Sequence, residues 1–103
     1  MPDSRPELMG IEYSIRFARP SDAILDGAIR GLPFFCGYDE RYQLYSLRLD
    51  PDDARPGMPD AHAKIEPGGI YFCDNRGSDV ARIRDALMAI GRRFDPAVTI
   101  EEL

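Results

Sequence analysis

The sequence predicts one α+β domain, a two-layer sandwich in which two helices cover one face of a mainly antiparallel β-sheet of four to five strands. Several segments alternate apolar and polar residues, which is typical of strands with one face in a core. Two other segments repeat their apolar residues at helical spacing. A chain of 103 residues has room for one such core.

A short motif occurs twice, each time between a predicted strand and a predicted helix. Its copies are Arg-Pro-Ser-Asp at residues 19–22 and Arg-Gly-Ser-Asp at residues 76–79. Ser21 and Ser78 are suited to cap a helix, and the following aspartates suit the positive end of the helix dipole. Beyond these positions the two helices differ, so we interpret the repeat as two helix starts and not as duplicated sites.

The N-terminal part of the chain predicts a flexible leader at residues 1–9, followed by the domain at residues 10–103. Residues 11–18 alternate apolar and polar side chains and predict a half-buried strand. The first helix follows, with an apolar stripe of Ile24, Leu25, Ala28, Ile29 and Leu32. Gly31 and Pro33 end it.

The middle of the chain predicts strands separated by turns and one long loop. Residues 34–38 fit a short strand or a turn, whereas residues 42–49 alternate more clearly. Residues 50–60 contain three prolines and four aspartates and predict a loop longer than most connections. Residues 61–66 and 70–74 flank a Pro-Gly-Gly turn and predict a hairpin.

The C-terminal part predicts a second helix and a last strand. The apolar seam of the helix consists of Val80, Ile83, Leu87, Ile90 and Phe94. Asp95 and Pro96 end the helix, and Val98 and Ile100 predict a short strand. This order of elements is close to a ferredoxin-like βαββαβ pattern with an added hairpin or a split middle strand.

Charge and composition narrow the classes of function. The chain has 13 basic and 18 acidic residues, a net charge of −5, and an acidic domain is poorly suited to bind phosphates. Nucleic-acid binding is therefore the least favoured function, and we interpret five arginines on or beside the second helix as a solvated face: Arg76, Arg82, Arg84, Arg92 and Arg93.

No segment reaches the roughly 18 apolar residues of a membrane span, and the first ten residues do not form a secretory signal. We expect a cytoplasmic protein without membrane association.

No motif in the chain indicates a reaction. Cys73 precedes a helix start, but a phosphatase-type loop would need arginine where the chain has Asp79. Cys36 and Cys73 lack the spacing of redox or zinc sites, and His62 is the only histidine. The acidic residues at 50–53 lack the pattern of a calcium loop. We predict no metal, no cofactor and no catalytic residue.

The sheet face opposite the helices is the candidate binding surface. Alternation assigns to it Glu12, Ser14, Arg16, Ser46, Arg48, His62, Lys64 and Glu66. The candidate binding residues among them are Arg16, Arg48, His62, Lys64 and Glu66. The five tyrosines belong either to the core or to an exposed aromatic patch of the kind enriched in interfaces.

Two classes of function fit these observations. The first is a small acidic, non-catalytic protein-interaction module that holds a partner with the open sheet face and the acidic loop. One form of it is an inhibitor- or immunity-type protein that caps a basic protein; self-association also fits, because a small domain buries limited surface. The alternative is a small-ligand-binding or enzymatic domain with a pocket on the open sheet face. It requires Arg16, Arg48, His62 and Glu66 to converge around a cavity.

Overall fold

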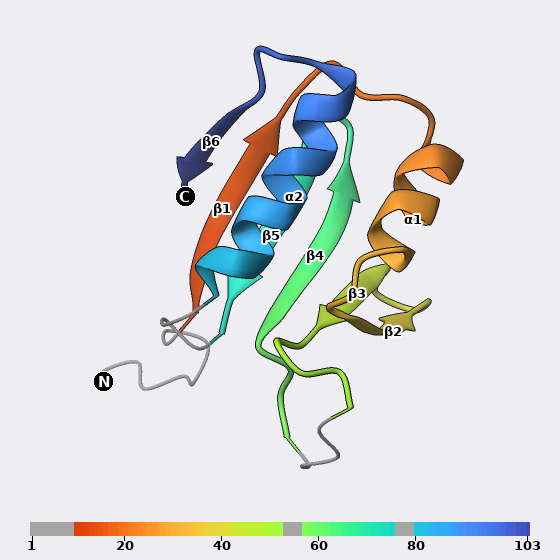
Figure 1. The fold of residues 1–103 in the computed structure, drawn as a ribbon, viewed down its shortest axis with the longest axis vertical. Coiled ribbons are helices and arrows are strands. Elements are labelled where there is room, and N and C mark those ends of the chain that lie inside the picture. The colour runs from red at the N-terminus through yellow and green to blue at the C-terminus, as the bar shows by residue number, and fades with distance from the viewer. Residues whose placement is uncertain (1–9, 53–56, 76–79) are drawn as a thin grey trace.

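The computed structural model describes residues 10–52, 57–75 and 80–103, which form six strands and two helices (Figure 1). In chain order these are β1 (Ile11–Arg16), α1 (Asp22–Arg30), β2 (Phe35–Asp39), β3 (Leu44–Leu47), β4 (Ala61–Glu66), β5 (Gly69–Asp74), α2 (Ala81–Phe94) and β6 (Thr99–Glu102). The predicted leader at residues 1–9 and the second Ser-Asp pair lie outside the described residues.

The strands form one antiparallel sheet in the order β2-β3-β4-β5-β1-β6. The α+β class is confirmed, but the sheet has six strands where four to five were predicted. The segment that fitted either a strand or a turn forms β2, which pairs with β3 at one edge of the sheet. The β2–β3 hairpin stands between α1 and β4 in the chain, so the ferredoxin-like layout is matched only roughly.

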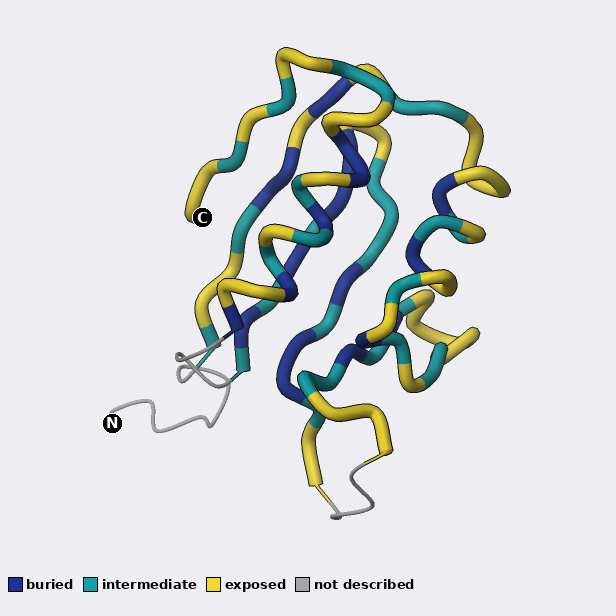
Figure 2. The backbone as a smooth tube through the Cα atoms, in the orientation of Figure 1, coloured by how far each residue is buried: buried dark blue, intermediate teal, exposed yellow. Residues whose placement is uncertain are grey.

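Both helices lie on the same side of the sheet, and the core fills the space between the two layers (Figures 1 and 2). The fully buried side chains include Ile15, Leu25, Ile29, Leu47, Ile70, Phe72, Ile83 and Leu87. Alternate residues of β4 and β5 supply Ala61, Ala63, Ile70 and Phe72 to this core, as their period-two pattern predicts. Burial of these apolar groups is the main stabilising contribution to the two-layer arrangement.

Helix α1 begins as its sequence predicts. The Ser21 Oγ accepts a hydrogen bond from the Ile24 backbone N–H at 3.4 Å, which satisfies one of the unpaired donors of the first turn. At the other end the Gly31 N–H donates to the Gly27 carbonyl. Of the predicted apolar stripe, Leu25 and Ile29 are buried, whereas Ile24 is 52% exposed.

The β4–β5 hairpin depends on one glycine. Gly69 has a φ of +151°, a backbone conformation that residues with a Cβ rarely adopt. A Cβ on Gly69 would also lie 1.9 Å from the Ile15 carbonyl oxygen of the neighbouring strand β1. The close approach of the β5 backbone to β1 at this position therefore requires a residue without a side chain.

Candidate functional site

No described helix covers the sheet face opposite α1 and α2, which we call the open face. Strand register places its residues in cross-strand rows, because neighbouring strands align side chains that point the same way. One row runs Ser46, His62, Cys73 and Glu12 across β3, β4, β5 and β1. The next runs Lys64, Tyr71, Ser14 and Glu101 across β4, β5, β1 and β6.

His62 and Cys73 lie opposite each other in the first row and are linked through Asn75. The Cys73 thiol donates to Asn75 Oδ1 at 3.4 Å, and Asn75 Nδ2 lies 3.1 Å from His62 Nδ1. The same Nδ2 donates to the Pro59 carbonyl at 3.1 Å. Both amide hydrogens of Asn75 thus have acceptors when His62 is neutral and accepts through Nδ1. Asn75 therefore connects the open face to the end of the long loop.

A second link joins β5 to β1. The Tyr71 hydroxyl donates to Glu12 Oε1 at 2.6 Å. Burial and the bond to this carboxylate raise the pKa of Tyr71, so the phenol keeps its proton. Sequence alternation did not single out Tyr71 or Asn75, although both follow the same i, i+2 series as Cys73 and share its face.

The electrostatic state of the His62–Cys73 pair is neutral. Burial lowers the pKa of His62, because the protein desolvates the imidazolium. Burial likewise raises the pKa of Cys73, so the sulfur is a thiol near neutral pH and a weak nucleophile. Within the described ranges, no three His, Cys, Asp or Glu side chains gather closely enough to hold a metal ion. The side chains of His62, Cys73 and Asn75 are instead arranged to hydrogen-bond with one another.

Three of the other four predicted binding residues contact groups outside this pair. Arg16 Nε is 3.6 Å from Glu101 Oε1 at the β1–β6 side, and Arg48 Nη2 donates to the Gly57 carbonyl at 2.9 Å. The Glu66 carbonyl accepts from Arg19 Nη1 at 2.8 Å, at the β4–β5 turn. Lys64 lies opposite Tyr71 in the second cross-strand row. No hydrogen bond or ion pair within the described part of the chain joins any two of Arg16, Arg48, His62, Lys64 and Glu66.

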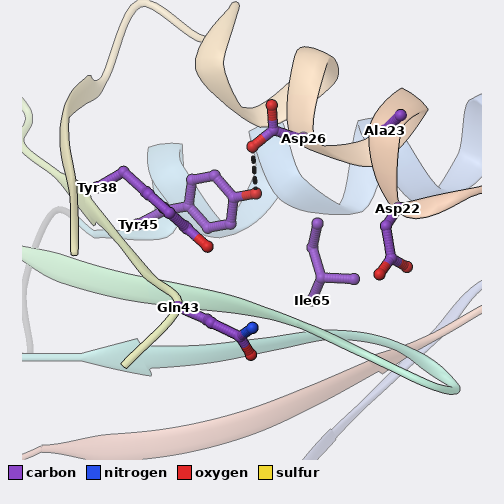
Figure 3. Close-up of a pocket in the computed structure, with 7 residues that line it drawn as sticks. All are labelled: Asp22, Ala23, Asp26, Tyr38, Gln43, Tyr45 and Ile65. Carbon is purple, nitrogen blue, oxygen red and sulfur yellow. Dashed lines mark hydrogen bonds between the residues drawn. The ribbon is translucent and has the colours of Figure 1, made fainter. Parts of the chain in front are cut away.

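A pocket of about 250 Å³ lies on the helix-covered side of the sheet, between α1 and strands β2, β3 and β4 (Figure 3). It is lined by Asp22, Ala23, Asp26, Tyr38, Gln43, Tyr45 and Ile65. None of the five predicted binding residues lines it. The sequence offered no signal for it, because its walls come from segments far apart in the chain.

Asp26 is the best-connected group of the pocket. Its Oδ1 accepts from the Tyr45 hydroxyl at 2.6 Å and from Arg30 Nε at 2.9 Å. These two bonds lower the pKa of Asp26, first through Tyr45 and then through Arg30. Asp22, one turn earlier on α1, forms an ion pair with Arg19. The pocket thus presents the ionised carboxylate of Asp26 at neutral pH.

No protein-family model matches this chain, and no curated protein or solved structure matches it either. In the residues that the structure describes, no helix is both long enough and apolar enough to cross a membrane. The function is therefore inferred from the residues and their arrangement.

Proposed function

We propose that this chain is a non-catalytic protein-interaction module that binds a positively charged protein through its open face. The observation that carries the proposal is a sheet face without a described helix over it, whose polar side chains are held in place by one another. The Tyr71–Glu12 and Cys73–Asn75–His62 hydrogen bonds order these groups before any partner arrives. Such preorganisation lowers the entropy that a protein loses on binding.

The charge of the chain supports a basic partner. The net charge is −5, and long-range attraction of this kind raises the rate of association with an oppositely charged surface. Glu12, Glu101 and Glu102 are exposed along the β1–β6 side, and Asp50 and Asp52 are exposed in the long loop. Two identical copies would repel each other through the same net charge, which favours a different protein over self-association.

The chemistry of the open face supports binding over catalysis. Its histidine and cysteine are both neutral near pH 7, so they lack the charged pair that activates a thiol. The half-buried Tyr71 and Leu44 add the mixed aromatic and apolar contact area that is common in the core of interfaces. In its narrower form the proposal is an inhibitor- or immunity-type role, in a cytoplasmic protein whose layout is a variant of the ferredoxin-like pattern.

The test compares two matched charge reversals in a reconstituted complex. A partner is first isolated from the source cells, then purified and titrated against the chain by calorimetry. Glu101→Arg alters the open face, and Asp85→Arg makes the same change on α2. Both carboxylates are largely exposed, and each lies within 4 Å of an arginine, at 3.6 Å from Arg16 and 3.7 Å from Arg84. We expect Glu101→Arg to weaken binding about tenfold and Asp85→Arg less than twofold.

Three results would overturn the proposal. The first is an equal or larger effect of Asp85→Arg, which would place the interface on the helix side. The second is a partner that binds with no dependence on salt, since attraction between opposite charges weakens as ionic strength rises. The third is a purified chain that binds only a second copy of itself.

A further inference from the structure

The pocket between α1 and the β2–β3 hairpin has acceptors for hydrogen bonds and no described cationic side chain in its wall. Asp22 and Asp26 supply two carboxylates, and Gln43 supplies an amide. Figure 3 shows the two carboxylates on one side of α1 and the Tyr38 and Tyr45 rings beside Asp26. Ala23 and Ile65 complete the wall with apolar surface. This combination suits a group with a positive end and an apolar stem.

The two carboxylates are spaced i, i+4 on one face of α1, where like charges repel each other. Arg19 and Arg30 offset this repulsion, but neither arginine lines the pocket. Each pairs with its carboxylate from outside, and the Asp22 side chain is still 79% exposed. A cation bound inside the pocket would reduce the remaining repulsion between Asp22 and Asp26.

The aromatic rings of the pocket already hold a cation within the chain. Arg30 Cζ lies 4.8 Å from the centre of the Tyr38 ring and 6.0 Å from that of Tyr45. The two rings are 4.6 Å apart, with an angle of 52° between their planes. Ring faces within about 6 Å of a guanidinium attract it through their quadrupoles. These rings therefore contact the guanidinium of Arg30, and the surroundings of the pocket already accommodate one positive group.

The size of the pocket limits its ligand to a small group. Sites for drug-sized molecules have volumes of about 300–1,000 Å³, so 250 Å³ suits one extended side chain or a short amine. From these features we propose that the pocket binds an alkyl cation, an ammonium or a guanidinium on a short apolar stem. This inference does not rest on the proposed open-face function, since the pocket lies on the other side of the sheet.

The test uses NMR titration of the labelled full chain at low salt and neutral pH. The probes are N-acetyl-arginine methylamide and N-acetyl-lysine methylamide, which model a side chain of a protein, and n-butylammonium, which models a free amine. N-acetyl-norleucine methylamide is the uncharged control of matched length. We expect saturable shifts at the backbone amides of Ala23, Gln43 and Ile65 with the cations and none with the norleucine derivative.

Variants establish the site of binding. Asp22→Asn removes one lining carboxylate, Ala23→Leu fills the pocket without changing charge, and Asp85→Asn is the matched control on α2. We expect Asp22→Asn to weaken binding about fivefold, as the loss of one partly exposed charge pair does. Ala23→Leu should abolish binding, and Asp85→Asn should leave it unchanged.

Comparison of the probes shows whether the pocket prefers the side chain of a protein or a free amine. Tighter binding of the amide derivatives than of n-butylammonium supports the side chain of a protein, and the reverse order supports a free amine. The inference is wrong if no cation shifts these amides, if norleucine methylamide binds equally, or if Asp85→Asn weakens binding as much as Asp22→Asn. None of these results bears on the open face, whose variants lie on the opposite side of the sheet.

Discussion

The Tyr45 hydroxyl donates a 2.6 Å hydrogen bond to Asp26 Oδ1, and this bond ties strand β3 to helix α1. Tyr45 is only 3% exposed, so its phenol has little access to water. The bond satisfies a polar group that would otherwise be buried without a partner. It also holds one wall of the pocket at a defined distance from the other.

Replacing Tyr45 with phenylalanine tests this link. We expect Tyr45→Phe to lower the free energy of unfolding by about 1–3 kcal/mol, because a hydrogen bond to a charged group is lost. The pKa of Asp26 should rise, since the Tyr45 bond is the largest cause of its lowering. Urea unfolding and carboxyl NMR titration measure the two effects. Tyr42→Phe is the control, because Tyr42 is 57% exposed; equal losses in both variants would contradict the account.

The two neighbouring glycines of the β4–β5 turn should respond differently to alanine. Gly69→Ala should destabilise the chain by about 3 kcal/mol, because it combines an unfavourable positive φ with a clash against the Ile15 carbonyl. Gly68→Ala should cost less than about 0.5 kcal/mol, because its Cβ would meet only the end of the Arg16 side chain at 3.5 Å. Thermal or urea unfolding of both variants decides the matter. Similar stabilities for the two would show that the turn is not built as described.

Gln43 is the one residue other than glycine in the described ranges with a positive φ, at 56°. This left-handed conformation costs most side chains about 1–2 kcal/mol, and glycine adopts it freely. Glycine also makes the unfolded chain more flexible, which offsets part of this gain in stability. We therefore expect Gln43→Gly to raise the free energy of unfolding by a net amount of roughly 0.5–1 kcal/mol. The same variant should weaken cation binding, because Gln43 lines the pocket. Loss of stability in Gln43→Gly would show that the amide makes a compensating contact.

The single histidine should make stability depend on pH in a narrow window. Burial lowers the pKa of His62 in the folded state below its value of about 6.5 in the unfolded state. The unfolded chain therefore binds a proton first as the pH falls, and the free energy of unfolding should decrease from about pH 6.5 downward. Unfolding measured between pH 5 and 8 should show this decrease in the natural sequence and not in His62→Gln. A flat profile in the natural sequence would mean that His62 is solvated.

Alternation of apolar and polar residues predicted the faces of the sheet well. Ala61 and Ala63 of β4 and Ile15 of β1 point into the core as the pattern indicates. The pattern failed to decide on β2, because the register shifts between Phe35 and Gly37. An irregularity of this kind breaks the period of two on which the prediction depends.

The contacts of the candidate sites were harder to predict than the faces. His62 and Cys73 are cross-strand partners only because the β4–β5 turn sets their register. Asn75 lies one residue beyond the strand predicted at residues 70–74, so the alternation did not assign it to the open face. The Asp26–Tyr45 hydrogen bond joins residues 19 positions apart on different elements, and no local sequence pattern predicts such a contact.

The most direct test of the proposed function is site-specific photo-crosslinking in the reconstituted complex with its purified partner. A benzophenone amino acid replaces Lys64 at the centre of the open face or, in a second variant, Arg84 on α2. We predict that the label at position 64 forms a crosslink to a basic surface of the partner and that the label at position 84 forms none. A crosslink from position 84 alone, or equal yields from both positions, would contradict binding through the open face.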